Sequence, residues 1–291
     1  MRTILLLVML LLPLSASEVS AEDKKATIAY IESLRDQETG AYKVTADGKP
    51  SLRACNGAVK SLKALGEPVR DIEKIRKFVL GCYDANTGAF AEPGGKPDVT
   101  ITSIGIIVAA EVGIPHKDIP EAMGTVLSKA NTFEEVRIAA AAVEAWGTDN
   151  LNLDQLRDSI KTDRDISKDD ARTNASELVT WMRLKSADKY KDWVIERQAA
   201  LAKTLQPGQC EDGGWRKLGE KTSDLESTYR VMRAFKMFDS KPTDIPALKK
   251  FIASHRNKDG GTAMKPGDPS SMSGVYYAVI IAMWLDEMEK K

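Results

Sequence analysis

A weak internal repeat constrains this chain more than any other feature of its sequence. Four segments share the order of an amphipathic stretch, a glycine-containing turn and a second, mostly more apolar stretch. The residues that follow the turn glycines are spaced 48 apart at Tyr42 and Phe90, and 47 apart at Trp215 and Thr262. Repeats of about 20 to 50 residues are typical of stacked units that cannot bury their apolar faces singly. The chain is therefore expected to be built from repeated hairpins.

Each repeat is predicted to be a pair of helices of different character. In the first helix the apolar residues recur every three or four positions, as at Ile72, Ile75 and Val79, which places them on one face. Second helices such as 101–112 and 274–285 are apolar almost all round, which is typical of helices buried on every side. An inner ring of buried helices inside an outer ring of amphipathic helices explains this contrast.

The stretch between Phe90 and Trp215 lacks a glycine turn of this kind, but it can hold two more helix pairs. These pairs are 116–130 with 133–146, and 151–160 with 173–184. Six hairpins can close into an all-α toroid, written (α/α)6, and an open solenoid of the same repeats is the alternative. We expect one toroid domain over residues 22–291, with no appreciable strand content.

The first 21 residues have the order of a secretory signal peptide. Arg2 is followed by the apolar run 4–14 and then by the small residues Ser20 and Ala21. An apolar run of about ten residues is too short for a transmembrane helix, which needs about 20, and an uncleaved anchor is the alternative. We therefore expect an exported protein, secreted or periplasmic, that is not an integral membrane protein once residues 1–21 are removed.

The amino-acid composition argues against some classes of partner for this chain, but it does not indicate an activity. The 291 residues contain 42 Lys and Arg against 42 Asp and Glu, a formal net charge of +0. Nucleic-acid surfaces need an excess of cations, so no nucleic-acid partner is expected. Three cysteines cannot form a disulfide framework, and two histidines leave little scope for a histidine-rich metal site.

Two segments carry a resemblance to a known superfamily. They are 78–113 and 209–238, and in the second Gln209, Gly213 and Trp215 match the Q-x-x-x-G-x-W repeat of squalene cyclases. On these residues the chain resembles the α/α-toroid superfamily of protein prenyltransferase β subunits and terpenoid cyclases. The resemblance covers nearly the whole mature chain. It implies the toroid fold, a transferase or cyclase acting on isoprenoids and, for the prenyltransferases, a zinc ion and a second subunit.

The residues that hold zinc in the prenyltransferases are only partly matched. The family uses D-x-C at the start of the fifth inner helix and a His at the start of the sixth. Here Asp224 matches the aspartate, Glu226 stands where the cysteine belongs, and no histidine begins the sixth helix. We expect no cofactor, with zinc only if the prenyltransferase interpretation holds, and Asp224, Glu226 and Asp268 as weak metal candidates. The acidic run 163–170 breaks the D-x-D-D motif of the cyclases and is interpreted as a solvated loop.

The predicted ligand-binding residues are those that line the centre of the ring or begin its fifth inner helix. They are Asp224, Glu226, Tyr229, Trp181, Tyr276 and Tyr277. Aromatic residues on inner helices belong either to the core or to a central cavity, where apolar pockets with a few polar groups are usual ligand sites.

We interpret the chain as an exported prenyltransferase-like toroid that binds an apolar chain or peptide in its central cavity, without zinc-dependent catalysis. A protein partner is a further expectation, and the sequence assigns no catalytic residue. The alternatives are an active geranylgeranyl transferase β-like enzyme or a terpene cyclase-like enzyme, and a sugar-active α/α-toroid enzyme.

Overall fold

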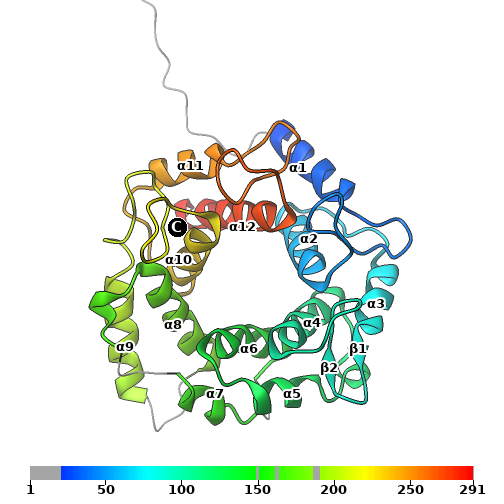
Figure 1. Cartoon of the computed structure of the whole chain (residues 1–291). Helices are drawn as coiled ribbons and strands as arrows, with labels where there is room; N and C mark the ends of the chain where they lie inside the picture. The colour runs from blue at the N-terminus through cyan, green and yellow to red at the C-terminus, as the bar shows by residue number, and fades with distance from the viewer. Residues whose placement is uncertain (1–20, 149–150, 161–163, 186–190, 291) are drawn as a thin grey trace, which may run out of the picture.

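A computed structural model describes residues 21–148, 151–160, 164–185 and 191–290. Within these residues, twelve α-helices alternate between an outer and an inner ring (Figure 1). The inner ring consists of α2 (Leu52–Ala64), α4 (Val99–Val112), α6 (Phe133–Trp146), α8 (Ala171–Leu184), α10 (Leu225–Met237) and α12 (Met272–Glu289). Each inner helix packs against the next, and α12 packs against α2. The ring is closed, so the predicted toroid is confirmed and the open solenoid is excluded.

The outer helices are less regular than the inner ones. They are α1 (Ala21–Ser33), α3 (Ile72–Gly81), α5 (Ala122–Lys129), α7 (Asp154–Asp158), α9 (Lys191–Lys203) and α11 (Ile245–Ser254). Two are shorter than predicted, because a separate 3₁₀-helix (His116–Asp118) precedes α5 and because α7 covers only the middle of 151–160. None of the described helices is long and apolar enough to cross a membrane. The predicted signal peptide lies outside the described residues, apart from Ala21.

All six inner helices begin at a side chain that caps the helix. Each capping side chain accepts a hydrogen bond from the backbone N–H three residues further on; these residues are Ser51, Asp98, Thr132, Asp170, Asp224 and Ser271. A cap of this kind contributes about 1 kcal/mol and fixes where the helix starts. Neighbouring inner helices therefore start in equivalent ways around the ring.

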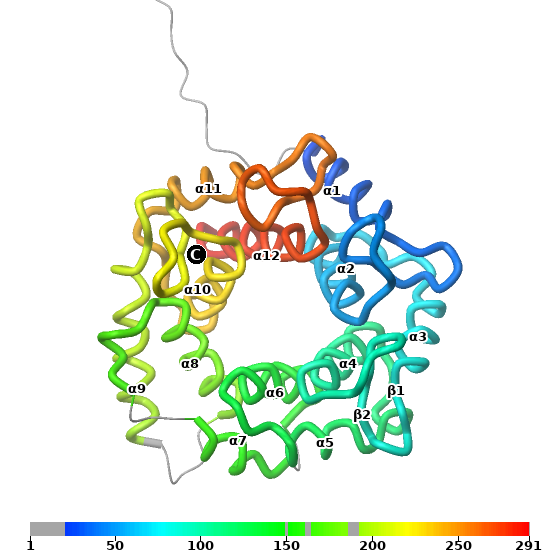
Figure 2. The backbone as a smooth tube through the Cα atoms, in the orientation of Figure 1, coloured from blue at the N-terminus to red at the C-terminus, as the bar shows by residue number. Residues whose placement is uncertain are grey.

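The aromatic residues of the glycine turns fill the space between the two rings. Tyr42, Phe90 and Trp215 are fully buried, as the repeat predicts. Trp215 Nε1 donates to the Leu205 carbonyl at 2.9 Å, which satisfies the one polar group of its side chain. The loops that carry these residues lie on the near side of the ring in Figure 2. One of them forms a two-stranded antiparallel hairpin, β1 (Tyr83–Asp84) with β2 (Ala89–Phe90), the one small sheet in the described residues.

Backbone and side-chain hydrogen bonds join the first hairpin to the last. Met272 N–H donates to the Val44 carbonyl at 2.9 Å, just where α12 begins. Thr27 Oγ1, on α1, donates to the Gly260 carbonyl at 3.2 Å. These contacts connect segments more than 200 residues apart in the sequence, so closure involves both rings and not only the packing of α12 on α2.

We expect Gly105→Ala to disrupt the packing of a turn aromatic. A Cβ on Gly105, in α4, would lie 2.3 Å from Phe90 Cγ, so the buried ring would have to move. Overpacking of this kind costs about 1 to 3 kcal/mol of unfolding free energy. Gly124→Ala in α5 is the matched control, because nothing lies within 4 Å of its added Cβ. Urea denaturation should show a loss only for Gly105→Ala, and equal stability of the two variants would contradict this packing.

Candidate functional site

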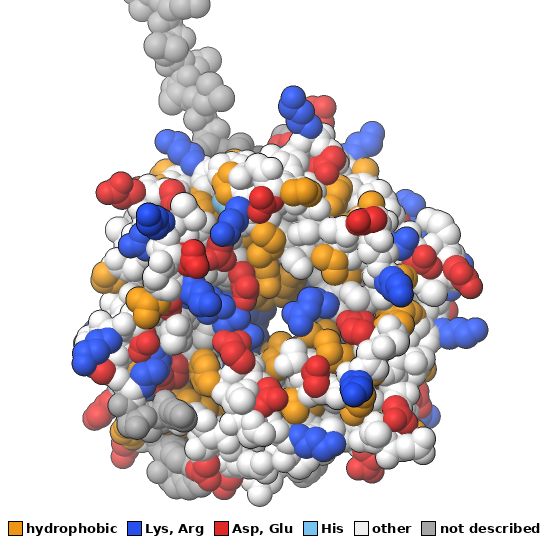
Figure 3. Space-filling view, in the orientation of Figure 1, with side chains coloured by type: hydrophobic (Ala, Val, Ile, Leu, Met, Phe, Trp, Pro, Cys, Tyr) orange, Lys and Arg blue, Asp and Glu red, His pale blue; other side chains and the backbone are white. Residues whose placement is uncertain are grey.

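The inner helices surround a central cavity of about 360 Å³, seen as the hollow in the middle of Figure 3. All six inner helices contribute to its lining. Tyr229 and Tyr276 are each the fifth residue of their helix, and their hydroxyl oxygens lie 2.5 Å apart. Residues at the same distance from the capping residue of α10 and α12 therefore lie at the same depth in the cavity. We call the lining residues near the capped helix ends the first tier and those further along the helices the deeper tier.

The cavity has an excess of positive charge although the whole chain has none. Six cationic side chains line it: Arg53, Lys60, Arg137, Arg183, Arg230 and Arg233. Only two carboxylates do so, Glu134 and Glu226. Apolar side chains complete the lining and include Ile104, Ile107, Ile138, Val179 and Met272. The site therefore combines cationic groups with an apolar surface.

Near the capped ends the two carboxylates are paired with arginines. Arg230 binds both, at 2.6 Å from Glu226 Oε1 and 3.1 Å from Glu134 Oε1. Arg172 also contacts Glu226, at 3.3 Å, and Arg137 contacts Glu134, at 2.8 Å. Burial raises the pKa of Glu134, but Arg137 and Arg230 outweigh it and lower the pKa to about 2. Both carboxylates of the lining are thus ionised and already paired, and the lining keeps an excess of cationic side chains.

The deeper tier of the lining contains Tyr229 and three cations close to it, Lys60, Arg183 and Arg233. Arg233 Nη2 donates to Tyr229 Oη at 2.8 Å, and Lys60 and Arg183 add positive charge from α2 and α8. Arg183 Nε bonds Glu144 Oε2 at 2.9 Å, a carboxylate that Arg233 Nη1 approaches only to 3.8 Å. Burial lowers the pKa of Arg183 to about 10, so it remains charged at neutral pH. Glu144 therefore pairs closely with Arg183 and only distantly with Arg233.

The Tyr229 ring is held among aromatic side chains. It stacks on Trp284 with the ring centroids 5.3 Å apart and contacts Tyr277 at 4.9 Å. Burial acts to raise the pKa of Tyr229, but Arg233, Lys60 and the Tyr276 hydrogen bond outweigh it, and the pKa is lowered. Burial and the neighbouring Tyr229 raise the pKa of Tyr276 well above its usual value. Tyr276 therefore stays protonated and donates a hydrogen bond to the Tyr229 oxygen.

Two buried polar atoms in the cavity wall lack a hydrogen-bond partner in the described structure. They are Asn56 Oδ1, an acceptor, and Arg233 Nε, a donor. Buried polar groups are almost always satisfied, and an orphan in a native structure calls for an explanation such as a bound molecule. Both atoms are closed off from the open cavity by their neighbours, so a hydroxyl and a carboxylate of an occupant would satisfy them only if the Asn56 and Arg233 side chains turn towards it.

Four of the six ligand-binding residues predicted from the sequence line this cavity: Glu226, Tyr229, Tyr276 and Tyr277. Asp224 does not, because its carboxylate caps α10 through Ser227 N and Ser227 Oγ, at 2.8 and 2.7 Å. Trp181 does not either, because it is buried in the core and packs edge-on against Trp193. The cavity arginines and Lys60 were not predicted from the sequence, because only acidic and aromatic residues of the inner helices were considered as site residues.

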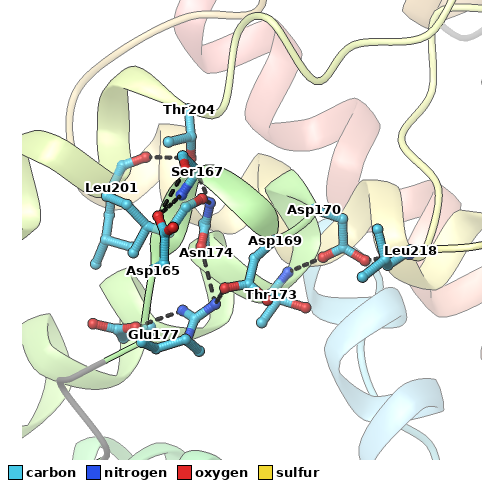
Figure 4. Close-up of polar contacts among 12 residues, drawn as sticks. Asp165, Ser167, Asp169, Asp170, Thr173, Asn174, Glu177, Leu201, Thr204 and Leu218 are labelled. Carbon is cyan, nitrogen blue, oxygen red and sulfur yellow. Dashed lines mark hydrogen bonds and ion pairs between the residues drawn. The ribbon is translucent and has the colours of Figure 1, made fainter.

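The acidic run 163–170 has a structural role in the part that the structure describes, which excludes Asp163 (Figure 4). Asp169 pairs with Arg164, and Asp170 caps α8 through Thr173 N–H. Arg164 also reaches the buried Glu177 at 2.5 Å. The predicted solvated loop is thus correct for Asp165, Ser167 and Lys168, which are exposed. It is wrong for Asp169 and Asp170, whose polar contacts hold the start of α8.

The residues predicted as weak metal candidates do not form a zinc site. Asp224 is engaged by Ser227, and Glu226 is engaged by Arg230 and Arg172. Asp268 is exposed in the loop before α12. A tight zinc site needs three or four converging donors, and in the described residues no three His, Cys, Asp or Glu side chains are so grouped. These carboxylates therefore do not fit the zinc ion of the prenyltransferases.

Comparison with known proteins gives the family. The family model of the prenyltransferase α/α-toroid domain matches residues 1–132 and 167–291. The chain belongs to this family. Its membership confirms the superfamily resemblance carried by the repeat. No curated protein sequence matches the chain.

Solved structures similar to this toroid include sugar-active proteins. A polysaccharide lyase is 14% identical with a TM-score of 0.62, over 93% of this chain and 97% of its own. A sugar epimerase from a ruminal bacterium is 13% identical with a TM-score of 0.61, over 91% and 98%. A glycosyl hydrolase family 88 protein from Bacteroides vulgatus is 14% identical with a TM-score of 0.60, over 92% and 98%. At these identities the likeness establishes the fold alone.

Proposed function

We propose that this prenyltransferase-family toroid binds a small acidic carbohydrate, a sugar bearing a carboxylate, in its central cavity. The observation that carries the proposal is the charge of the lining, six cationic side chains against two carboxylates that are already paired with arginines. Arginine and lysine in a partly desolvated site bind carboxylates through charge-assisted hydrogen bonds. A volume of about 360 Å³ is at the small end of ligand pockets and suits a ligand of one or two sugar rings.

Two further observations support a carbohydrate. The orphan atoms of Asn56 and Arg233 call for a hydroxyl donor and an anionic acceptor, which a sugar acid offers together. The tyrosine cluster provides aromatic faces and hydroxyl groups on the same wall. The similar structures named above act on sugars, by their descriptions, and thus favour the interpretation that the sequence analysis placed last.

The apolar chain predicted from the sequence is the second candidate, in the form of an isoprenoid diphosphate. Ile104, Ile107 and Ile138 give the cavity an apolar surface that could contact such a chain, and the cations could bind its phosphates. An uncharged chain or peptide would leave the cations without counter-charge. We favour the sugar acid because the two atoms without hydrogen-bond partners belong to residues that line the cavity.

Calorimetric titration distinguishes these ligands. We expect digalacturonate to bind the purified protein, its neutral counterpart galactobiose to bind at least tenfold more weakly, and geranylgeranyl diphosphate to be the weaker of the two anions. The affinity for digalacturonate should fall as salt is raised, because ion pairing carries the preference. Equal binding of the acidic and neutral disaccharides, or preference for the isoprenoid diphosphate, would contradict the proposal.

We further propose that residues 1–21 direct export and are then removed, which would place the toroid outside the cytoplasm. The basis is the order of charge, apolar run and small residues in the sequence. Sequencing the N-terminus of protein recovered from the periplasm or medium should find a start near Glu22. A protein that retains Met1 in the membrane fraction would contradict the removal of residues 1–21.

A further inference from the structure

We propose that Tyr229 is a catalytic residue that removes and returns the proton on the carbon next to the carboxylate of a bound sugar acid. The inference rests on the proposed function and adds a reaction to it. It assigns to the cavity the class of enzymes that act on a C–H bond made acidic by a neighbouring carboxylate.

The first ground is the position of the phenol oxygen. Tyr229 Oη accepts a hydrogen bond from Arg233 Nη2 at 2.8 Å and lies 2.5 Å from Tyr276 Oη. Two donors on one oxygen stabilise its deprotonated form. The Tyr229 side chain lines the cavity and is held by stacking on Trp284, so the oxygen is fixed at the cavity wall.

The second ground is the charge that faces this oxygen from the surrounding helices. Arg233 comes from α10 itself, Lys60 from α2 and Arg183 from α8, and all three favour the phenolate. Two carboxylates offset part of this charge: Glu144 on α6, which is paired with Arg183, and Glu111 on α4, which lies 3.6 Å from Lys60 Nζ. From α12, the neutral Tyr276 adds a hydrogen bond that favours the phenolate. Glu226 and Arg230, towards the capped ends, form an ion pair with each other. The net field lowers the pKa of Tyr229, which is what a general base near neutral pH requires.

The third ground is the orphan donor beside the same oxygen. The Arg233 guanidinium binds Tyr229 Oη through Nη2, while its buried Nε has no partner in the described residues. A turn of the guanidinium would open this enclosed atom to a substrate carboxylate, which would then share one guanidinium with the base. Asn56 Oδ1, the other orphan, would accept a hydrogen bond from a sugar hydroxyl. One arginine would thus place the acidic C–H bond and the phenolate on the same side of the ligand.

The proposed step balances without any further reactant. The Tyr229 phenolate takes the proton as the C–H bond breaks, and the electron pair moves into a new double bond to the carboxylate carbon. The resulting enediolate has two negative oxygens, which Arg233 and Lys60 are placed to stabilise. Returning the proton from Tyr229 to the carbon restores the phenolate and the sugar acid. This proton abstraction is the first step of both isomerisation and elimination.

Hydrogen–deuterium exchange tests the step directly. Digalacturonate is incubated with the protein in D2O, and proton NMR follows loss of the signal of the proton on the carbon that bears the carboxylate. We expect exchange with the wild type that increases with pH and levels off below the pKa of free tyrosine, about 10. Tyr229→Phe should slow exchange at least 100-fold, the usual scale for loss of a general base, while digalacturonate binds within a few-fold of the wild type. Tyr83→Phe, outside the cavity, should exchange as the wild type does.

Each contrary result has a distinct meaning. If the wild type binds digalacturonate without exchange, or Tyr229→Phe exchanges at the wild-type rate, the catalytic role is overturned while the binding function stands. If digalacturonate does not bind at all, the proposed function is overturned and the inference with it. The pH profile of the wild type keeps the test valid if Tyr229→Phe does not fold, because exchange that is independent of pH would also overturn the role of a titrating phenol.

Discussion

Glu177→Gln should lower the free energy of unfolding by about 3 kcal/mol or more. The Glu177 side chain is 1% exposed and binds two arginines, with Arg197 Nε at 2.7 Å and Arg164 Nη2 at 2.5 Å. Removing one partner of a buried ion pair leaves charge buried without compensation, which typically costs about 3 to 5 kcal/mol. These contacts connect α8 to the stretch that precedes it and to α9. Urea denaturation followed by circular dichroism measures the loss.

The matched control for this prediction is Glu220→Gln, which changes the same group in an exposed turn before α10. Its unfolding free energy should stay within about 0.5 kcal/mol of the wild type, as is usual for surface substitutions. If Glu177→Gln is as stable as Glu220→Gln, the buried pairing around α8 does not exist in solution.

Arg233→Gln should weaken the binding of digalacturonate about 100-fold. Its guanidinium supplies the orphan donor of the cavity and lies in the deeper cationic tier with Lys60 and Arg183. Losing one partner of a buried, hydrogen-bonded charge pair costs about 2 to 5 kcal/mol of binding free energy, and 100-fold is near the lower end. Calorimetric titration of the variant, after its circular dichroism spectrum has been matched to the wild type, gives the change.

Arg216→Gln serves as the control for charge alone, because Arg216 is exposed in a loop outside the cavity lining. We expect its affinity for digalacturonate to stay within twofold of the wild type. Equal weakening in both variants would mean that the net charge of the protein, and not the cavity, determines binding.

The fold could be predicted from the sequence because each repeat needs particular residue types at its turn and along its two helices. Turn glycines mark four hairpins, three of them with an aromatic residue after the turn, and the pattern of apolar residues separates inner from outer helices. The pairs without a glycine turn were placed correctly on their inner helices, since 133–146 coincides with α6. Their outer helices lie within the predicted ranges but are shorter, because a separate 3₁₀-helix precedes α5 and because α7 is only five residues long.

The site was only half predictable, for a physical reason. Tyr229, Tyr276 and Tyr277 stand out as aromatics on inner helices, but Arg230 and Arg233 have the spacing of an ordinary solvated helix face. Only closure of the ring turns that face towards an enclosed space. The capping residue at the start of every inner helix is the signal that could have found them, because counting from it places Arg233 and Lys60 at the same ninth position.

A crystal structure of the protein with digalacturonate tests the central claim most directly. The account predicts density for the disaccharide inside the ring. The Arg233 and Asn56 side chains should have turned so that Arg233 Nε binds a carboxylate and Asn56 Oδ1 accepts from a hydroxyl, because these two atoms of the cavity-lining residues lack partners in the described structure. The sugar carbon next to that carboxylate should face Tyr229 Oη. A disaccharide bound on the outer surface, or one that leaves these two atoms without partners at saturating ligand, would contradict the assignment of the cavity to acidic sugars.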